Sequence, residues 1–131
     1  MFLLDTNTLI YFFKGEGRVA QTLVATPAHE VAVSTVSVFE LETGLRKSTD
    51  PRRRRSQFEA LLDAVQLLSL DAPAARAAAG VRAALETKGQ PIGPLDTLIA
   101  GIALSRDATL VTRNLDEFSR VPQLKVVDWH G

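Results

Sequence analysis

The chain has 131 residues, enough for one hydrophobic core, so we expect a single domain spanning residues 1–131. It has no cysteine, which excludes disulfides and thiolate zinc sites, and its two histidines are too few for a histidine-rich metal site. The 15 basic and 15 acidic residues cancel, which excludes a strong overall attraction to nucleic acid but allows local charged patches. There is no apolar stretch of membrane-spanning length and no basic leader, so we expect a cytoplasmic protein.

The first ten residues predict a short buried strand that ends at Asp5 and a helix that follows it directly. Apolar residues precede the acid, and the helix is expected to open with Thr6, Asn7 or Thr8 near its N-cap. An acid at the carboxyl end of a buried strand lies where open α/β sheets bind ligands. Asp5 also has a simpler interpretation, because an acid in this position commonly caps the next helix.

The rest of the chain alternates between short apolar or β-branched runs and longer patterns with helical spacing. Further strands are predicted at residues 30–34, 66–71, 109–112 and 125–127. Helices are predicted after Pro51 and at residues 8–14, 18–25, 35–46, 72–88, 95–104 and 114–118. This alternation favours a three-layer α/β/α domain with a central parallel sheet of four to five strands. The helix at 95–104 is almost entirely apolar and is expected to be buried.

Several acids are predicted to lie at the edge where the parallel strands end. Asp5 follows the first strand, Glu40 lies in the helix after the second, and Asp96 opens the helix before the fourth. Clustered carboxylates repel one another, so they require protonation or a neutralising cation. Oxygen ligands favour Mg²⁺ or Mn²⁺, and such an ion promotes phosphodiester hydrolysis. Glu40 has an alternative role, because Ser37 and Glu40 have the spacing of a capping box.

Four segments together resemble the PIN-domain family, and more narrowly the VapC-type toxins of bacterial toxin–antitoxin pairs. They are LDTN at 4–7, FEL at 39–41 with glycine at 44, PIGPLDTLIA at 91–100, and LVTRN at 110–114 followed by Phe118 and Val121-Pro122. The resemblance extends over essentially the whole chain. It implies an endoribonuclease that depends on Mg²⁺ or Mn²⁺ and forms a homodimer. It also implies inhibition by a small antitoxin whose C-terminal segment blocks the acidic site.

The resemblance also implies roles for individual residues. By motif match, the metal-binding carboxylates are Asp5, Glu40 and Asp96. The family often has a fourth acid two residues after the threonine of the 110–114 segment, where this chain has Asn114. Asn114 can offer a carbonyl oxygen, and Asp116 or Glu117 can substitute if the loop bends inward. Candidates for orienting the carboxylates or water are Thr6, Asn7 and Thr112.

Basic residues near the acidic edge are candidates for contacts to RNA phosphates, namely Lys14, Arg46 and Arg113. The four consecutive arginines at 52–55 have two interpretations, as the solvated first turn of a helix or as a further RNA contact. We expect cleavage of single-stranded or loop RNA that leaves a 5′-phosphate and a 3′-hydroxyl.

Two other functions remain open from the sequence. An aspartate after a strand also serves as the nucleophile of aspartyl-phosphate enzymes, although that class commonly has a second aspartate where this chain has Asn7. The other alternative is a dimeric, non-catalytic module whose acidic pocket receives a basic segment of another protein. Metal binding separates this module from a nuclease.

Overall fold

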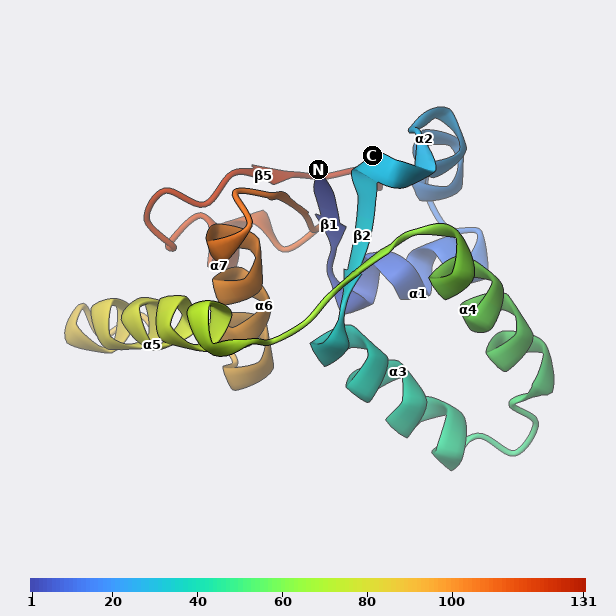
Figure 1. Ribbon diagram of the computed structural model, residues 1–131, viewed down its shortest axis with the longest axis horizontal. Helices are drawn as coiled ribbons and strands as arrows, with labels where there is room; N and C mark the ends of the chain where they lie inside the picture. The colour runs from blue at the N-terminus through green and yellow to red at the C-terminus, as the bar shows by residue number, and fades with distance from the viewer.

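The computed structural model describes residues 1–131, and a five-stranded parallel sheet forms its centre (Figure 1). The strands are β1 (Phe2–Leu4), β2 (Val31–Ser34), β3 (Gln66–Leu68), β4 (Thr109–Val111) and β5 (Val126–Val127). Their order across the sheet is β3-β2-β1-β4-β5, which places β1 in the middle. In register, Leu3 pairs with Ala32 on one side and with Leu110 on the other. The predicted parallel sheet is confirmed.

Helices cover both faces of this sheet, in the predicted three layers (Figure 1). They are α1 (Thr6–Lys14), α2 (Val19–Ala25), η1 (Ala28–Glu30), α3 (Thr35–Lys47), α4 (Arg52–Ala64), α5 (Ala72–Thr87), α6 (Pro94–Ser105) and α7 (Leu115–Phe118). The third strand differs most from its predicted bounds, because it ends at Leu68. Asp71 instead caps α5 by accepting a 3.0 Å hydrogen bond from the Ala74 amide. No helix here combines the length and the apolar character that crossing a membrane requires.

The sheet separates two apolar cores, because successive strand residues point to opposite faces. On one face, Leu3 and Leu110 pack with residues of α5, α6 and α7. On the other, Leu4 and Val111 pack with residues of α1, α2 and α4 and with Trp129. Trp129 is therefore a core residue, and the two ends of the chain meet in one cluster.

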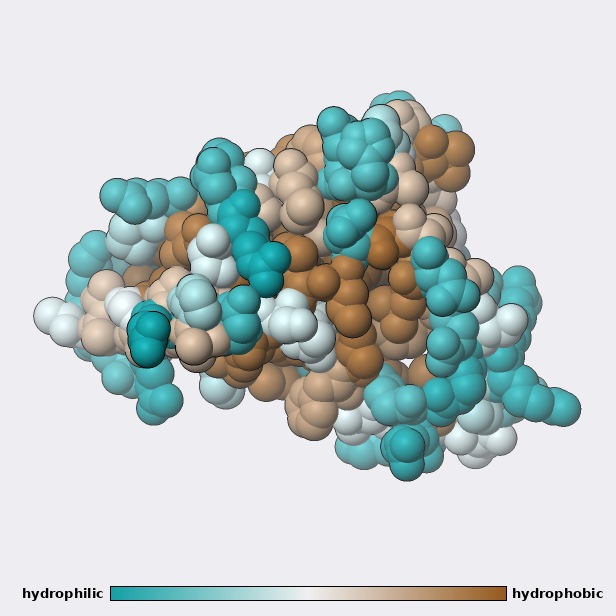
Figure 2. Space-filling model, in the orientation of Figure 1, coloured by the Kyte–Doolittle hydropathy of each residue, from teal (hydrophilic) through white to brown (hydrophobic).

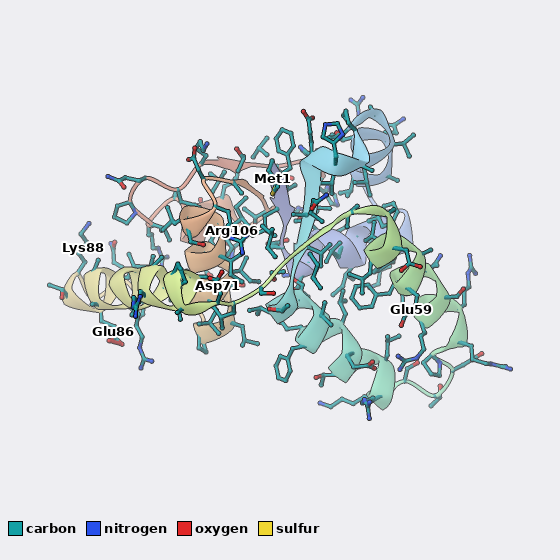
Figure 3. All side chains as sticks on the ribbon, in the orientation of Figure 1. Met1, Glu59, Asp71, Glu86, Lys88 and Arg106 are labelled. Atoms are coloured by element: carbon teal, nitrogen blue, oxygen red, sulfur yellow. The ribbon has the colours of Figure 1, made fainter.

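α6 is the central helix that its apolar sequence predicts, with Ile99 and Ile102 fully buried. Gly101 allows α5 to approach closely, since an added Cβ would lie 2.5 Å from that of Ala78. A surface ion pair of 3.1 Å between Asp71 at the start of α5 and Arg106 after α6 links the same two helices (Figure 3). This packing fixes α6, and with it the acid in its first turn.

Candidate functional site

Asp5 lies at the middle of the sheet edge where the strands end, and it is 4% exposed. Its Oδ1 accepts a 2.8 Å hydrogen bond from the Thr8 amide, and α1 begins at Thr6. Asp5 is therefore the helix cap, which confirms the simpler interpretation of this acid, and the helix opens with Thr6 as predicted. Burial raises the pKa of Asp5, although hydrogen bonds from Thr112 and Thr8 act in the opposite direction.

Asp96 lies in the first turn of α6 and faces the other acids at the same edge. Burial, aided by the negative charges of Asp5, Glu117 and Glu40, raises the pKa of Asp96 to about 6. A helix N-terminus ordinarily stabilises a carboxylate, so burial and like charge outweigh it here. The three acids that the sequence singles out thus act on one another electrostatically, and Glu117 joins them.

None of these four acids forms an ion pair with a lysine or an arginine. Partly buried carboxylates without a basic partner are costly unless a proton or a cation neutralises them. As they stand, no three acidic, histidine or cysteine side chains are close enough to enclose a metal ion. The donors are nevertheless oxygen atoms with an excess of negative charge, which is the chemistry that Mg²⁺ and Mn²⁺ prefer. The residues therefore fit such an ion in the type of ligand that they offer.

Glu40 is held by a chain of buried hydroxyl groups. Thr6 donates a 2.7 Å hydrogen bond to Glu40 Oε1, so the 2.9 Å contact between Thr6 and Ser37 uses the Ser37 proton. Ser34 donates in turn to Ser37 over 3.4 Å. Ser34 also caps α3 by accepting from the Ser37 amide, so the capping-box alternative for Glu40 is wrong. The hydroxyl chain instead fixes the Glu40 carboxylate in place.

The segment after β4 supplies the remaining polar groups. Thr112 is fully buried, and its hydroxyl accepts a 3.0 Å hydrogen bond from the Asn114 amide. Asn114 is exposed at the start of α7 and makes no side-chain cap. Of the two acids considered as substitutes for the missing fourth one, Glu117 acts on Asp96, whereas Asp116 is exposed and is not among the groups that shift its pKa.

Arg113 extends from the same edge and is held by two rings. Its guanidinium carbon lies 5.6 Å from the centre of the Tyr11 ring, and Nη1 lies 3.2 Å from Nε2 of His130. His130 is seated against Gly17, where an added Cβ would come within 2.5 Å of the His130 carbonyl oxygen. The end of the chain therefore restrains Arg113, which directly follows the buried Thr112 after β4.

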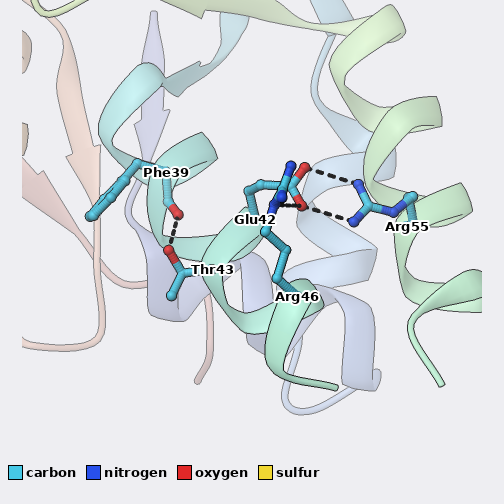
Figure 4. Close-up of polar contacts among 5 residues, drawn as sticks. All are labelled: Phe39, Glu42, Thr43, Arg46 and Arg55. Carbon is cyan, nitrogen blue, oxygen red and sulfur yellow. Dashed lines mark hydrogen bonds and ion pairs between the residues drawn. The ribbon is translucent and has the colours of Figure 1, made fainter. Parts of the chain in front are cut away.

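The other two predicted basic residues lie near the ends of α1 and α3. Lys14, at the end of α1, lines a cleft that also contains Asn7 and Glu40. Arg46 does not line this cleft. It lies 3.6 Å from Glu42 on α3, and Glu42 also binds Arg55 of α4 (Figure 4). Because the Arg46 side chain is 78% exposed and such a surface ion pair is weak, Arg46 stays a predicted phosphate contact outside the cleft.

Three comparisons relate this chain to known proteins. The PIN domain matches residues 2–124. The tRNA(fMet)-specific endonuclease VapC of Salmonella typhimurium is 36% identical over 128 residues, which cover 98% of this chain and 97% of that protein. Ribonuclease VapC2 of Rickettsia felis is 30% identical over 131 residues, which cover 98% of each. In the crystal structure of VapBC2 from Rickettsia felis bound to a promoter DNA fragment, a chain 31% identical matches with a TM-score of 0.90 over 98% of both chains.

Proposed function

The chain belongs to the PIN-domain family, and on that premise we propose that it is an endoribonuclease of the VapC type, the toxin of a toxin–antitoxin pair. The observation that carries the proposal is a group of acids without basic partners at the carboxyl edge of the sheet: Asp5, Glu40, Asp96 and Glu117. Relatives aligned over nearly the whole chain are named as RNA-cleaving enzymes. Carboxylates with a divalent ion hydrolyse phosphodiesters without a histidine, cysteine or serine nucleophile.

The proposal assigns Mg²⁺ or Mn²⁺ to these acids. Asp5, Glu40 and Asp96 hold the ion, Glu117 stands in for the missing fourth acid, and Asn114 offers a carbonyl oxygen. When bound, such an ion polarises a phosphoryl oxygen and lowers the pKa of the attacking water. The raised pKa values of Asp5 and Asp96 support this assignment, because bringing in positive charge relieves the cost of ionising both carboxyl groups.

The remaining residues position the reacting groups. The hydroxyl chain through Thr6 and Ser37 keeps the Glu40 carboxylate in place, and the Thr112 hydroxyl supports Asp5. Arg113, fixed by its aromatic contacts, binds a phosphate next to the acids, for which a planar guanidinium is well suited. Attack by water in line with the leaving 3′-oxygen gives one end with a 5′-phosphate and one with a 3′-hydroxyl.

The partners follow from the same assignment. VapBC2 of Rickettsia felis is a complex that binds a DNA fragment from its promoter. We extend this arrangement to the present chain, with a small antitoxin that covers the acidic edge and thereby inhibits cleavage. The proposed assembly is built on a homodimer of the toxin chain.

Binding without catalysis is a second candidate function, in which the acidic pocket only receives a basic segment of another protein. One observation favours it, namely that no three acids enclose an ion as they stand. Titration with Mn²⁺ separates the two functions, because a pure binding module requires no divalent ion.

Incubation of the purified protein with total RNA and Mn²⁺, followed by mapping of the ends, tests the proposed function. We expect discrete cuts with 5′-phosphate ends, and EDTA abolishes them. Asp5→Asn removes the activity, whereas Asp63→Asn, which neutralises an exposed acid on α4, retains it. Cleavage that continues in EDTA, or that leaves cyclic phosphate ends, contradicts the proposal.

A further inference from the structure

A cleft of about 890 Å³ lies between α1, α3 and α4, and it begins at Thr6, Asn7 and Glu40 of the acidic site. We propose that this cleft is a second RNA subsite, in which Lys14, Arg53 and Arg54 bind backbone phosphates that flank the cut. This inference rests on the proposed nuclease function. It adds the course of the substrate strand on one side of the acids and a role for the arginine run at 52–55.

The first turn of α4 has four consecutive arginines, and only two of them have acidic partners. Arg52 pairs with an acid of the preceding loop at 3.4 Å. Arg55 donates two hydrogen bonds to Glu42, of 2.9 and 2.8 Å (Figure 4). Arg53 and Arg54 form no ion pair, and both line the cleft. Positive charge is unfavourable at a helix N-terminus. A bound anion would neutralise the two unpaired arginines and would also interact favourably with the helix dipole.

Arg54 is already held in a fixed position. Its guanidinium carbon lies 5.2 Å from the centre of the Phe13 ring, and its Nη1 is buried without a hydrogen-bond acceptor. Buried donors without partners are rare in proteins, and a phosphate provides several oxygen acceptors that match a guanidinium. Because the ring restrains the side chain, little conformational freedom is lost when a phosphate binds.

Charge along the cleft changes sign from one end to the other. Glu40 lies at the acidic end, and the other acid in the lining, Asp50, is paired with Arg52. Lys14 contributes an exposed positive charge without an ion pair from the α1 wall. Hydrophilic side chains gather over the outer parts of α3 and α4, beside a more apolar central surface (Figure 2). The basic residues of the cleft can therefore neutralise backbone phosphates of an RNA strand that is cut at the acids.

An ion pair between Glu42 and Arg55 links α3 and α4, two of the helices that line the cleft, without itself lining it. Glu42 accepts both guanidinium hydrogen bonds, and this bidentate geometry sets α4 against α3 (Figure 4). Since Arg55 is committed to Glu42, the structure distinguishes it from Arg53 and Arg54. This difference allows paired and unpaired arginines of one helix turn to be compared directly.

The test replaces the two unpaired arginines in a chain that binds RNA without cutting it. In an Asp96→Asn background, Arg53→Gln/Arg54→Gln is titrated with a labelled, mixed-sequence single-stranded RNA at several salt concentrations, with fluorescence anisotropy as the readout. We expect Kd to rise about tenfold and the slope of log Kd against log salt to fall by about 1.4, because each lost phosphate contact contributes about 0.7 for single strands. The lysine variant Arg53→Lys/Arg54→Lys keeps the charge and restores the slope.

Arg76→Gln/Lys88→Gln is the matched control, because it removes the same charge from exposed residues without ion pairs on α5 and at its C-terminal cap, at the other end of the molecule (Figure 1). This control leaves Kd within about twofold of the Asp96→Asn parent. With Asp96 restored, the glutamine variant in the cleft raises KM for RNA cleavage and leaves kcat near that of the wild type.

Unchanged Kd and salt slope in the Arg53→Gln/Arg54→Gln variant overturn the inference, and a cleft that docks only a protein partner gives this result. An equal loss in the α5 control overturns it as well, because the effect then belongs to overall charge. A wild-type protein that does not cut RNA with Mn²⁺ overturns the proposed function instead. The two failures are therefore distinguishable.

Discussion

The face of the sheet under α5, α6 and α7 is closely packed, whereas the face under α1, α3 and α4 leaves an open cleft beside the acids. Small residues such as Ala78 and Gly101 bring α5 against α6 with no room for a further methyl group. On the other face, Phe13 and Phe58 form part of a cleft wall that also has basic residues. One face therefore holds Asp96 in a tightly packed frame, while the other leaves the space that we assign to a substrate strand.

The largest effect is expected when the packed face is disturbed. Gly101→Ala places its Cβ 2.5 Å from the Ala78 Cβ and 2.6 Å from the Ala78 nitrogen, so α5 has to move. We expect a loss of about 3 kcal/mol in the free energy of unfolding, measured by urea denaturation. In Gly80→Ala on α5, the added Cβ has no neighbour within 4 Å. This substitution is expected to raise the free energy of unfolding by about 0.5–1 kcal/mol through helix propensity. Equal effects of the two substitutions would contradict the description of this face.

The hydroxyl chain at the border of the open face is the next test. Ser37→Ala removes the donor to Thr6, which leaves Glu40 less firmly held. We expect kcat for RNA cleavage to fall about tenfold, the usual scale for a residue that orients a ligand. Thr43→Ala, on the same helix, loses only a local bond to the Phe39 carbonyl (Figure 4) and retains the activity. Similar kcat values for Ser37→Ala and Thr43→Ala would show that the hydroxyl chain does not contribute to catalysis.

A smaller effect is expected from Asp96, because ionising this acid lowers the free energy of unfolding. The pKa of Asp96 is raised from 3.8 to about 6, so the folded protein retains a proton that the unfolded chain releases between these values. Stability is thus lost as pH rises through about 6. Above that pH, Asp96→Asn is expected to raise the free energy of unfolding by about 1 kcal/mol. This value allows for solvent screening, because Asp96 is only half-buried.

Urea denaturation across the pH range checks this expectation for Asp96→Asn. The gain over the wild type disappears below the unfolded pKa of 3.8, where Asp96 is protonated in both states. Added Mn²⁺ narrows the difference at higher pH, because it stabilises only a protein that binds it. If Asp96→Asn is less stable than the wild type at all pH values, ionised Asp96 does not destabilise the folded protein.

Most of the fold can be predicted from the sequence because it depends on local patterns. The apolar runs around Leu3 and Leu110 predict strands of one sheet, and the apolar pattern after Asp96 predicts a buried helix. The role of Asp5 is harder to settle from the sequence, because aspartate and threonine are both good caps and only the backbone shows that Asp5 caps α1.

The site is harder to predict where it depends on contacts between distant segments. Ser37 and Thr6 are 31 residues apart, and no periodicity indicates their hydrogen bond. Asp116 and Glu117 are equivalent in the sequence, and only the turn of α7 sets Glu117 toward Asp96. Lys14 and Arg46 are both phosphate candidates from the sequence, yet only Lys14 lines the cleft that contains Glu40.

The role of the acids is tested by the rate of RNA cleavage as a function of Mn²⁺ concentration, measured for the wild type and Asp96→Asn side by side. The wild type is expected to show saturable activation that EDTA reverses. Asp96→Asn, although more stable at neutral pH, is expected to lose at least about a hundredfold in kcat/KM, or about 2.7 kcal/mol of transition-state stabilisation. Cleavage without added divalent ions, or a fully active Asp96→Asn, would show that the acids do not have this role.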